Sequence, residues 1–153
     1  MSAISHVAVA NRSDRVTSAT TSAVRPAIVL AGRIFFSAIF LMTALSHFSS
    51  KTVAYAAGAG VPFASLAVPV CGLIAITGGL SILLGYRARI GAWLLVLFLV
   101  PVTLTMHNFW AVKDPMMAQI QMVMFMKNVS MLGGALLISQ FGSGPWSLDA
   151  RQK

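Results

Sequence analysis

Four long apolar segments dominate this chain and restrict what it can fold into. They cover residues 27–48, 63–84, 90–110 and 120–141, and each is 21 or 22 residues long. A helix that crosses the hydrocarbon core of a bilayer needs about 20 such residues. Because lipid offers the backbone no hydrogen-bond partners, each segment must pair its own amide groups as an α-helix. The sequence therefore predicts an all-α integral membrane protein, a four-helix bundle.

Composition supports this class and excludes several others. Hydrophobic residues make up 58% of the chain and charged residues 9%, and the three acids include no glutamate. An ordinary soluble domain is about 25% charged. The single cysteine, Cys71, excludes an intramolecular disulfide and a cysteine-based zinc site, so no metal site is predicted. The basic residues form no stripe, which indicates the lipid bilayer rather than nucleic acid as the partner.

Polar segments lie on both sides of the apolar region. Residues 1–26 are rich in Ser, Thr and Arg and contain no apolar stretch typical of a signal peptide. They are predicted to form a disordered cytoplasmic tail, with an organelle transit peptide as the alternative. Residues 27–141 are predicted to form the transmembrane domain. Residues 142–153 are predicted to be a short cytoplasmic C-terminal tail.

The distribution of basic residues predicts the orientation. With the N-terminus inside, the inner side holds seven of them: Arg12, Arg15, Arg25, Arg87, Arg89, Arg151 and Lys153. The outer side then holds only Lys51 and Lys113. Because cytoplasmic loops carry the excess of Lys and Arg, both termini are predicted to be cytoplasmic. The predicted location is the cell inner (plasma) membrane, with the chain crossing it several times.

The apolar segments suggest an internal repeat. The first and third segments both end in a Thr-x-x-x-His motif, at His47 and at His107. The second and fourth segments each contain a glycine pair, Gly78-Gly79 and Gly133-Gly134. Small residues allow helices to approach closely in lipid, so these pairs are predicted to be packing positions. A duplicated helical hairpin explains the pattern, and chance matching of common membrane residues is the alternative.

Two basic residues lie inside the predicted spans. Arg33 is about 9 Å into the first helix, and we expect it to extend to the cytoplasmic headgroups. Lys127 is about 12 Å from the outer end of the fourth helix, in spans that hold no acid. It therefore needs backbone carbonyls, water, a lipid phosphate or a ligand oxygen as its partner.

Polar side chains gather toward the outer ends of the predicted helices. The candidates are His47, His107, Asn108, Trp110, Lys127 and Asn128. Together they are predicted to line a pocket for the oxygens of a quinone or for a lipid headgroup. The alternative is a pair of interfacial histidines bonded to headgroups and loops. Haem held between the two histidines is a rival that requires a larger cavity. No catalytic residue can be assigned.

Several short motifs resemble those of a known family. They are Gly32-Arg33, Gly60-Val61-Pro62, Arg89-x-Gly91-Ala92, His107-Asn108-Phe109-Trp110 and Phe125-x-Lys127-Asn128. These motifs follow one another in this order, and from Gly32 to about Asp149 the chain resembles the DoxX family of small four-helix membrane proteins. That resemblance implies a link to thiosulfate–quinone or thiol and oxidative-stress chemistry. Ala75 is a departure, since many relatives carry a Glu there.

Two functions remain open at this point. The first is a quinone-linked membrane subunit of an oxidoreductase complex, with His107 and Lys127 contacting the quinone oxygens and His47 and Asn128 supporting them. A redox partner protein would supply the electrons. The second is a non-enzymatic membrane scaffold, or a protein that binds or transports lipid or a small molecule. Helices that are apolar all round also allow a homo-oligomer.

Overall fold

The computed structural model describes residues 25–152. Within this range it contains four helices that are long and apolar enough to cross a membrane: Arg25–Phe48, Ala64–Leu84, Ala88–Ala111 and Pro115–Phe141. The predicted all-α fold with four spanning helices is therefore confirmed. The predicted N-terminal tail lies outside the described residues except for Arg25 and Pro26, which belong to the first helix.

The two halves of the chain end their first long helix in a similar way. The first helix, residues 25–44, continues into a 3₁₀ turn, η1 (Leu45–Phe48). Helix α4 (Ala88–Met106) is likewise followed by a 3₁₀ turn, η2 (Phe109–Ala111). The second long helices are α3 (Ala64–Leu84) and α5 (Pro115–Phe141). The order of elements is thus similar in the two halves, and the duplicated hairpin suggested by the sequence stays a prediction.

A short helix in the first connection distinguishes the two halves. Helix α2 (Ser50–Gly58) lies in the segment that the sequence suggested only as a loop. The side chain of Ser49 caps it by accepting a hydrogen bond from the amide of Thr52 at 3.2 Å. Serine is a favoured N-cap, so this residue was the available signal for the helix.

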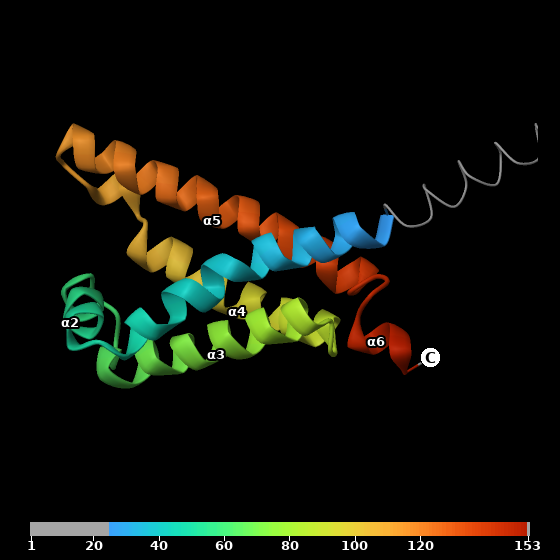
Figure 1. Ribbon diagram of the computed structural model, residues 1–153. Coiled ribbons are helices and arrows are strands. Elements are labelled where there is room, and N and C mark those ends of the chain that lie inside the picture. The colour runs from blue at the N-terminus through green and yellow to red at the C-terminus, as the bar shows by residue number, and fades with distance from the viewer. Residues whose placement is uncertain (1–24, 153) are drawn as a thin grey trace, which may run out of the picture.

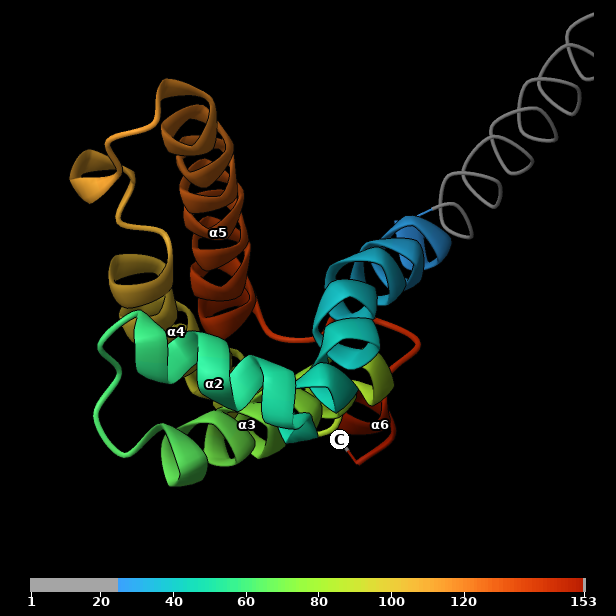
Figure 2. The ribbon, with the colours of Figure 1, turned by 90° about the vertical axis from the view of Figure 1, so that its left-hand side faces the viewer.

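The long helices run between two ends of the bundle (Figure 1). At one end, here called the terminal end, the first helix begins and α6 (Leu148–Arg151) lies. At the other, the loop end, lie α2 and η2. Helix α4 packs against both α3 and α5. The view toward the loop end shows α5 standing apart from α2 and α3 (Figure 2).

Small residues form the closest contacts between the helices. A Cβ added to Gly78 would lie 2.8 Å from the Leu95 side chain and 2.9 Å from the carbonyl oxygen of Gly91 on α4. At Gly134 it would lie 2.7 Å from the ring of Phe36 on the first helix. Gly79 similarly adjoins Leu41 at 3.1 Å, whereas Gly133 has open space within 4 Å. Three of the four paired glycines thus lie at helix contacts.

Residues 142–152, predicted to be a polar tail, fold back against the terminal end of the bundle. The amide of Asp149 donates to the carbonyl oxygen of Gly85 at 2.8 Å, which attaches α6 to the turn between α3 and α4. Ser143 and Ser147 are buried there, with 5% and 3% of their surface exposed. This segment contributes its backbone carbonyls to the interior of the protein.

Candidate functional site

One face of α5 carries polar side chains into the loop-end half of the bundle. Gln121, Asn128 and Ala135 follow one another at intervals of seven residues, which places them on one side of a helix. Asn128 and Ala135 are 5% and 0% exposed, and Ala135 belongs to the hydrophobic core. Gln121 and Asn128 lie about 10 Å apart along the helix at 1.5 Å per residue. They therefore form a polar stripe on the face of α5 that packs inward.

His107 joins this stripe from α4. It is the C-cap residue of that helix, and its Nδ1 lies 2.7 Å from Oε1 of Gln121. The tautomer sets the roles in this pair: with Nδ1 protonated and donating to Oε1, Nε2 is an acceptor. The amide nitrogen of Gln121 keeps two N–H donors. The pair therefore offers one acceptor and two donors to a third group.

Asn128 is the most enclosed polar side chain of the stripe. The residue is 5% exposed, and its side-chain amide makes no hydrogen bond to any of residues 25–152. Its amide atoms keep some accessible surface, whereas Nε of Arg33 and Oγ of Ser37 are the fully enclosed side-chain atoms without a partner in this range. Buried amides are almost always hydrogen-bonded in proteins, and one that is not requires an explanation. A bound polar group or a water molecule is the simplest explanation at this position.

Three aromatic rings close the loop end of this region. Phe109 and Trp110 of η2 lie edge to face, with their centroids 5.2 Å apart. Phe125 of α5 packs against both, at 5.5 Å and 5.8 Å. Such edge-to-face contacts are favourable for aromatic rings and fix η2 onto α5. Asn108 begins η2, and its carbonyl oxygen accepts from the amide of Ala111 at 2.9 Å.

His47 has partners of its own, different from those of His107. Its Nδ1 is 3.2 Å from the carbonyl oxygen of Thr43, one turn earlier in the chain. Its ring lies edge to face with Phe98 of α4, with 5.7 Å between centroids. His47 therefore contacts the first helix, an apolar face of α4, and Gly72 of α3, where an added Cβ would lie 2.8 Å from the Cβ of His47. No contact joins it to His107 within the described residues.

Lys127 lies farther along its helix than the sequence indicated, and its side chain is exposed. Helix α5 begins at Pro115, so Lys127 is about 18 Å along it. The side chain is exposed, and the hydrogen bond recorded for its ammonium within residues 25–152 runs to the thioether of Met124 at 3.4 Å. A thioether is a weak acceptor, which leaves the cation poorly satisfied. Lys127 is also rotated away from the face that carries Asn128.

The position of Arg33 differs from the one expected from the sequence. Instead of extending to headgroups, it is 5% exposed beneath the C-terminal segment. Its guanidinium donates to three backbone carbonyls, those of Leu83, Ser143 and Trp146, each at 3.1 Å. The expectation was wrong because carbonyls at the end of α3 and in the folded-back segment lie within hydrogen-bond distance of the guanidinium. Arg33 is therefore a structural residue.

Two important residues were not among the candidates from the sequence. Gln121 was missed, although its spacing of seven from Asn128 was a usable signal. Asp149 was missed because it lies in a segment predicted to be a tail. Its carboxylate caps α4 by accepting from the amides of Arg87 at 2.8 Å and Ala88 at 3.2 Å. A cap supplied from so far along the chain leaves no local pattern.

Comparison with known proteins identifies the family. The family model described as the SURF4 family matches residues 13–153. The chain is 30% identical to the inner membrane protein YphA of Escherichia coli (strain K12) over 131 residues, 84% of this chain and 93% of the relative. It is 29% identical to the inner membrane protein YqjF of the same organism over 123 residues, 79% of this chain and 88% of the relative. No solved structure matches the chain.

The resemblance to the DoxX family is therefore wrong. The motifs behind it were glycines and basic residues near helix starts, and aromatic and polar residues near helix ends. Any small bundle of membrane helices needs small residues at contacts and aromatic residues near the interface, so these features do not separate families. The match over residues 13–153 covers nearly the whole sequence, and this multi-pass membrane protein belongs to the SURF4 family.

Proposed function

We propose that this protein is a non-enzymatic inner-membrane protein that binds the polar head of a lipophilic molecule in the loop-end half of its bundle. The head would lie against Asn128 and the His107–Gln121 pair. The names of the two relatives support the inner membrane as its location. The proposal includes the orientation indicated by the basic residues, with both termini in the cytoplasm.

The buried amide of Asn128 carries this proposal. It is 5% exposed and lacks a hydrogen bond to the described residues, two helical turns from a second polar pair. A fully buried amide that is left unsatisfied costs about 1–3 kcal/mol, and an amide that keeps some accessible surface costs less. A ligand that bonds to this amide would recover that free energy, whereas a purely structural role would be served better by an apolar side chain.

The donors and acceptors restrict the chemistry of the head. Nε2 of His107 accepts, while the amide nitrogens of Gln121 and Asn128 donate. A hydroxyl group at either level matches, because it donates through its hydrogen and accepts through its oxygen, and a head with two polar groups could reach both the His107–Gln121 pair and Asn128. Half-buried methionines, Met124 and Met131, flank the stripe on α5. Their flexible side chains adapt to apolar ligands of different shapes.

A quinone-linked oxidoreductase subunit is the second candidate. Quinol hydroxyls fit the same donors and acceptors, which is the observation in its favour. In this geometry Nε2 of His107 would accept from a quinol hydroxyl, and the amide of Gln121 or of Asn128 would donate to a quinone oxygen. Lys127 and His47 would then act from outside the polar stripe. Electrons would still have to come from a partner protein.

Purification in mild detergent, followed by mass spectrometry of extracted lipophilic molecules, tests both candidates. We expect one hydroxyl-bearing species to be retained, and Asn128→Leu to reduce it about tenfold, as loss of one or two hydrogen bonds would. Gln119→Leu is the matched control, since it removes an exposed amide from the same helix. Equal retention by Asn128→Leu and the wild type would contradict the proposal. Retained quinol with turnover beside a donor protein would instead favour the second candidate.

A further inference from the structure

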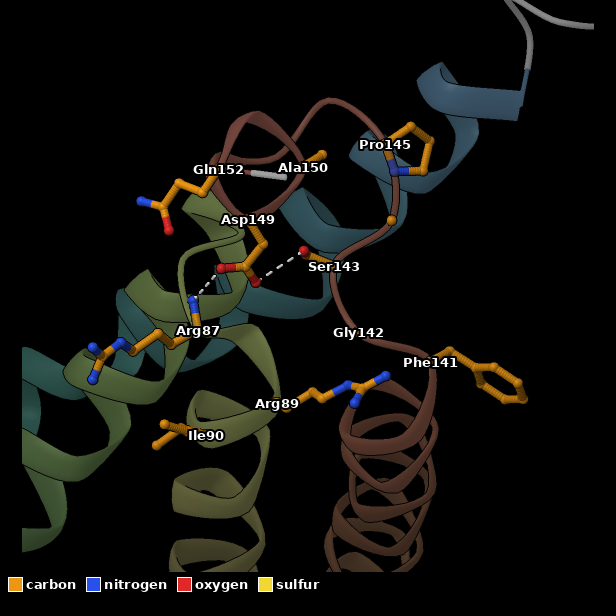
Figure 3. A pocket seen from close by; sticks show the side chains of 11 residues that line it. Arg87, Arg89, Ile90, Phe141, Gly142, Ser143, Pro145, Asp149, Ala150 and Gln152 are labelled. Carbon is orange, nitrogen blue, oxygen red and sulfur yellow. Dashed lines mark hydrogen bonds between the residues drawn. The ribbon is translucent and has the colours of Figure 1, made fainter.

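A second pocket lies at the terminal end of the bundle, at the opposite end from the polar stripe of α5. It has a volume of about 730 Å³ and opens between the start of α4, the end of α5 and the folded-back C-terminal segment. Its lining includes Arg87, Arg89, Ile90, Phe141, Asp149 and Gln152 (Figure 3). Pockets of about 300–1,000 Å³ are typical of sites for small ligands and cofactors.

One wall of this pocket is fixed by Asp149. Its carboxylate accepts from the amides of Arg87 and Ala88 and from the hydroxyl of Ser143 at 3.2 Å (Figure 3). The first amides of α4 are therefore already capped, and they do not provide an anion site. The carboxylate also attracts the buried guanidinium of Arg33, which offsets its negative charge. These hydrogen bonds hold the wall in place, and the negative charge of Asp149 is largely offset.

Arg89 is the free cation of this pocket. Its side chain extends from the first turn of α4 toward Gly142 and Phe141 at the end of α5 (Figure 3). Its Nε lies 3.5 Å from the position of a Cβ built on Gly142. The structure gives this exposed guanidinium no hydrogen bond or ion pair with any of residues 25–152. Arg87 differs, because its guanidinium lies 5.7 Å from the centre of the Tyr86 ring.

Exposed apolar side chains lie beside this cation in the lining of the pocket. Phe141 is 81% exposed and Ile90 is 56% exposed, and both line the pocket. A guanidinium binds phosphate oxygens in a bidentate manner. Basic pockets between transmembrane helices on the cytoplasmic side bind anionic lipid headgroups. The combination of one unpaired arginine with apolar walls fits a phosphate that carries acyl chains better than a free phosphate ion.

We propose that this pocket binds the phosphate headgroup of an anionic phospholipid through Arg89, with the acyl chains lying along Phe141 and Ile90. The site is independent of the polar stripe on α5 and takes a different chemical group. Binding there would hold the folded-back C-terminal segment against the bilayer surface.

The test uses the full chain reconstituted in nanodiscs of phosphatidylcholine with a minority of phosphatidylglycerol, and then released for native mass spectrometry. We expect the wild type to retain phosphatidylglycerol, and Arg89→Gln to reduce its retention about tenfold, as expected for loss of charge-assisted hydrogen bonds. Arg151→Gln is the matched control, because Arg151 is an exposed arginine at the same end that lines a different pocket. Its retention should equal that of the wild type.

Any one of four outcomes would overturn the proposal. Equal losses in Arg89→Gln and Arg151→Gln would indicate general attraction to charge. Free phosphate at about 10 mM competes only if it binds with roughly millimolar affinity. If it displaces the lipid, the site takes the free ion. Retention in Arg89→Gln at the wild-type level would remove Arg89 from the site. If Arg89→Gln fails to fold, Arg89→Lys replaces it in the test. Lysine keeps the positive charge but cannot bind phosphate in the bidentate manner of arginine, so unchanged retention of phosphatidylglycerol by Arg89→Lys would overturn the proposal.

Discussion

Arg33 and Asp149 are joined through a single residue, Ser143. The guanidinium of Arg33 donates to the carbonyl oxygen of Ser143 at 3.1 Å, and the hydroxyl of Ser143 donates to the carboxylate of Asp149 at 3.2 Å. One charge lies in the first helix and the other near the C-terminus. Together they hold residues 142–152 against the terminal end of the bundle.

Replacing Arg33 should release this segment. Arg33→Ala removes three hydrogen bonds from a charged donor to buried carbonyls, and we expect a loss of about 3 kcal/mol in the free energy of unfolding. Limited proteolysis should then cut within residues 142–152, and the melting temperature in detergent should fall. Arg25→Ala is the control, since Arg25 is an exposed arginine of the same helix. Equal protease resistance in both variants would contradict this role.

Replacing Asp149 should destabilise the same unit through a different bond. Asp149→Ala removes the N-cap of α4, which is worth about 1–2 kcal/mol. Because Arg33 and Asp149 hold one segment, the double variant should lose less stability than the sum of the single variants. Asp114→Ala provides a comparison, because Asp114 caps α5 by accepting from the amide of Met117 at 2.8 Å. Additive losses for Arg33 and Asp149 would show that they act separately.

The two glycine pairs allow a matched test of helix packing. Gly78→Ala places a Cβ 2.8 Å from Leu95 and should cost about 1–3 kcal/mol, because the α3–α4 contact must open. Gly133→Ala meets nothing within 4 Å and gains about 1 kcal/mol of helix propensity, so it should be neutral or stabilising. Thermal unfolding in one detergent compares them. A similar loss for both would contradict the packing described for α3.

Asn128 should show a conflict between stability and binding. Asn128→Leu removes a buried amide that has no partner among the described residues, and we expect the ligand-free protein to gain about 1 kcal/mol in stability. The same variant should lose its bound lipophilic molecule. Unfolding of delipidated protein measures the first effect, and mass spectrometry of extracts measures the second. A destabilised variant would indicate that the amide has a structural role.

The orientation can be measured with fusions. A phosphatase that is active only outside the cytoplasm should be inactive after residue 152 and active when inserted between Ala59 and Gly60, in the turn after α2. The physical reason is the excess of Lys and Arg at the terminal end. Activity at the C-terminus with inactivity in the α2 turn would reverse the assignment. The polar stripe would then lie in the cytoplasmic half of the bilayer.

The residue types in the sequence predicted most members of the candidate site, but they did not predict how these residues are arranged in space. His107 and Asn128 were predicted as polar groups in the loop-end half, and the structure places both near the inward face of α5. Their link through Gln121 required the actual rotation of α5 against α4. Rotation also separated Lys127 from Asn128, although they are neighbours in sequence. Helical neighbours differ by about 100° in direction, so only packing decides which of them faces inward.

The sequence by itself determined the four membrane spans, because spanning depends on apolar length and on backbone hydrogen bonds made within each segment. Both are local properties of the chain. The tertiary structure alone decided which groups the charged side chains of Arg33 and Asp149 bind. Arg33 bonds to the carbonyls of Leu83 and Ser143, residues 50 and 110 positions away, and Asp149 caps a helix 62 positions before it. Backbone carbonyls and amides occur at every residue, so no sequence pattern marks which of them a distant charge will reach.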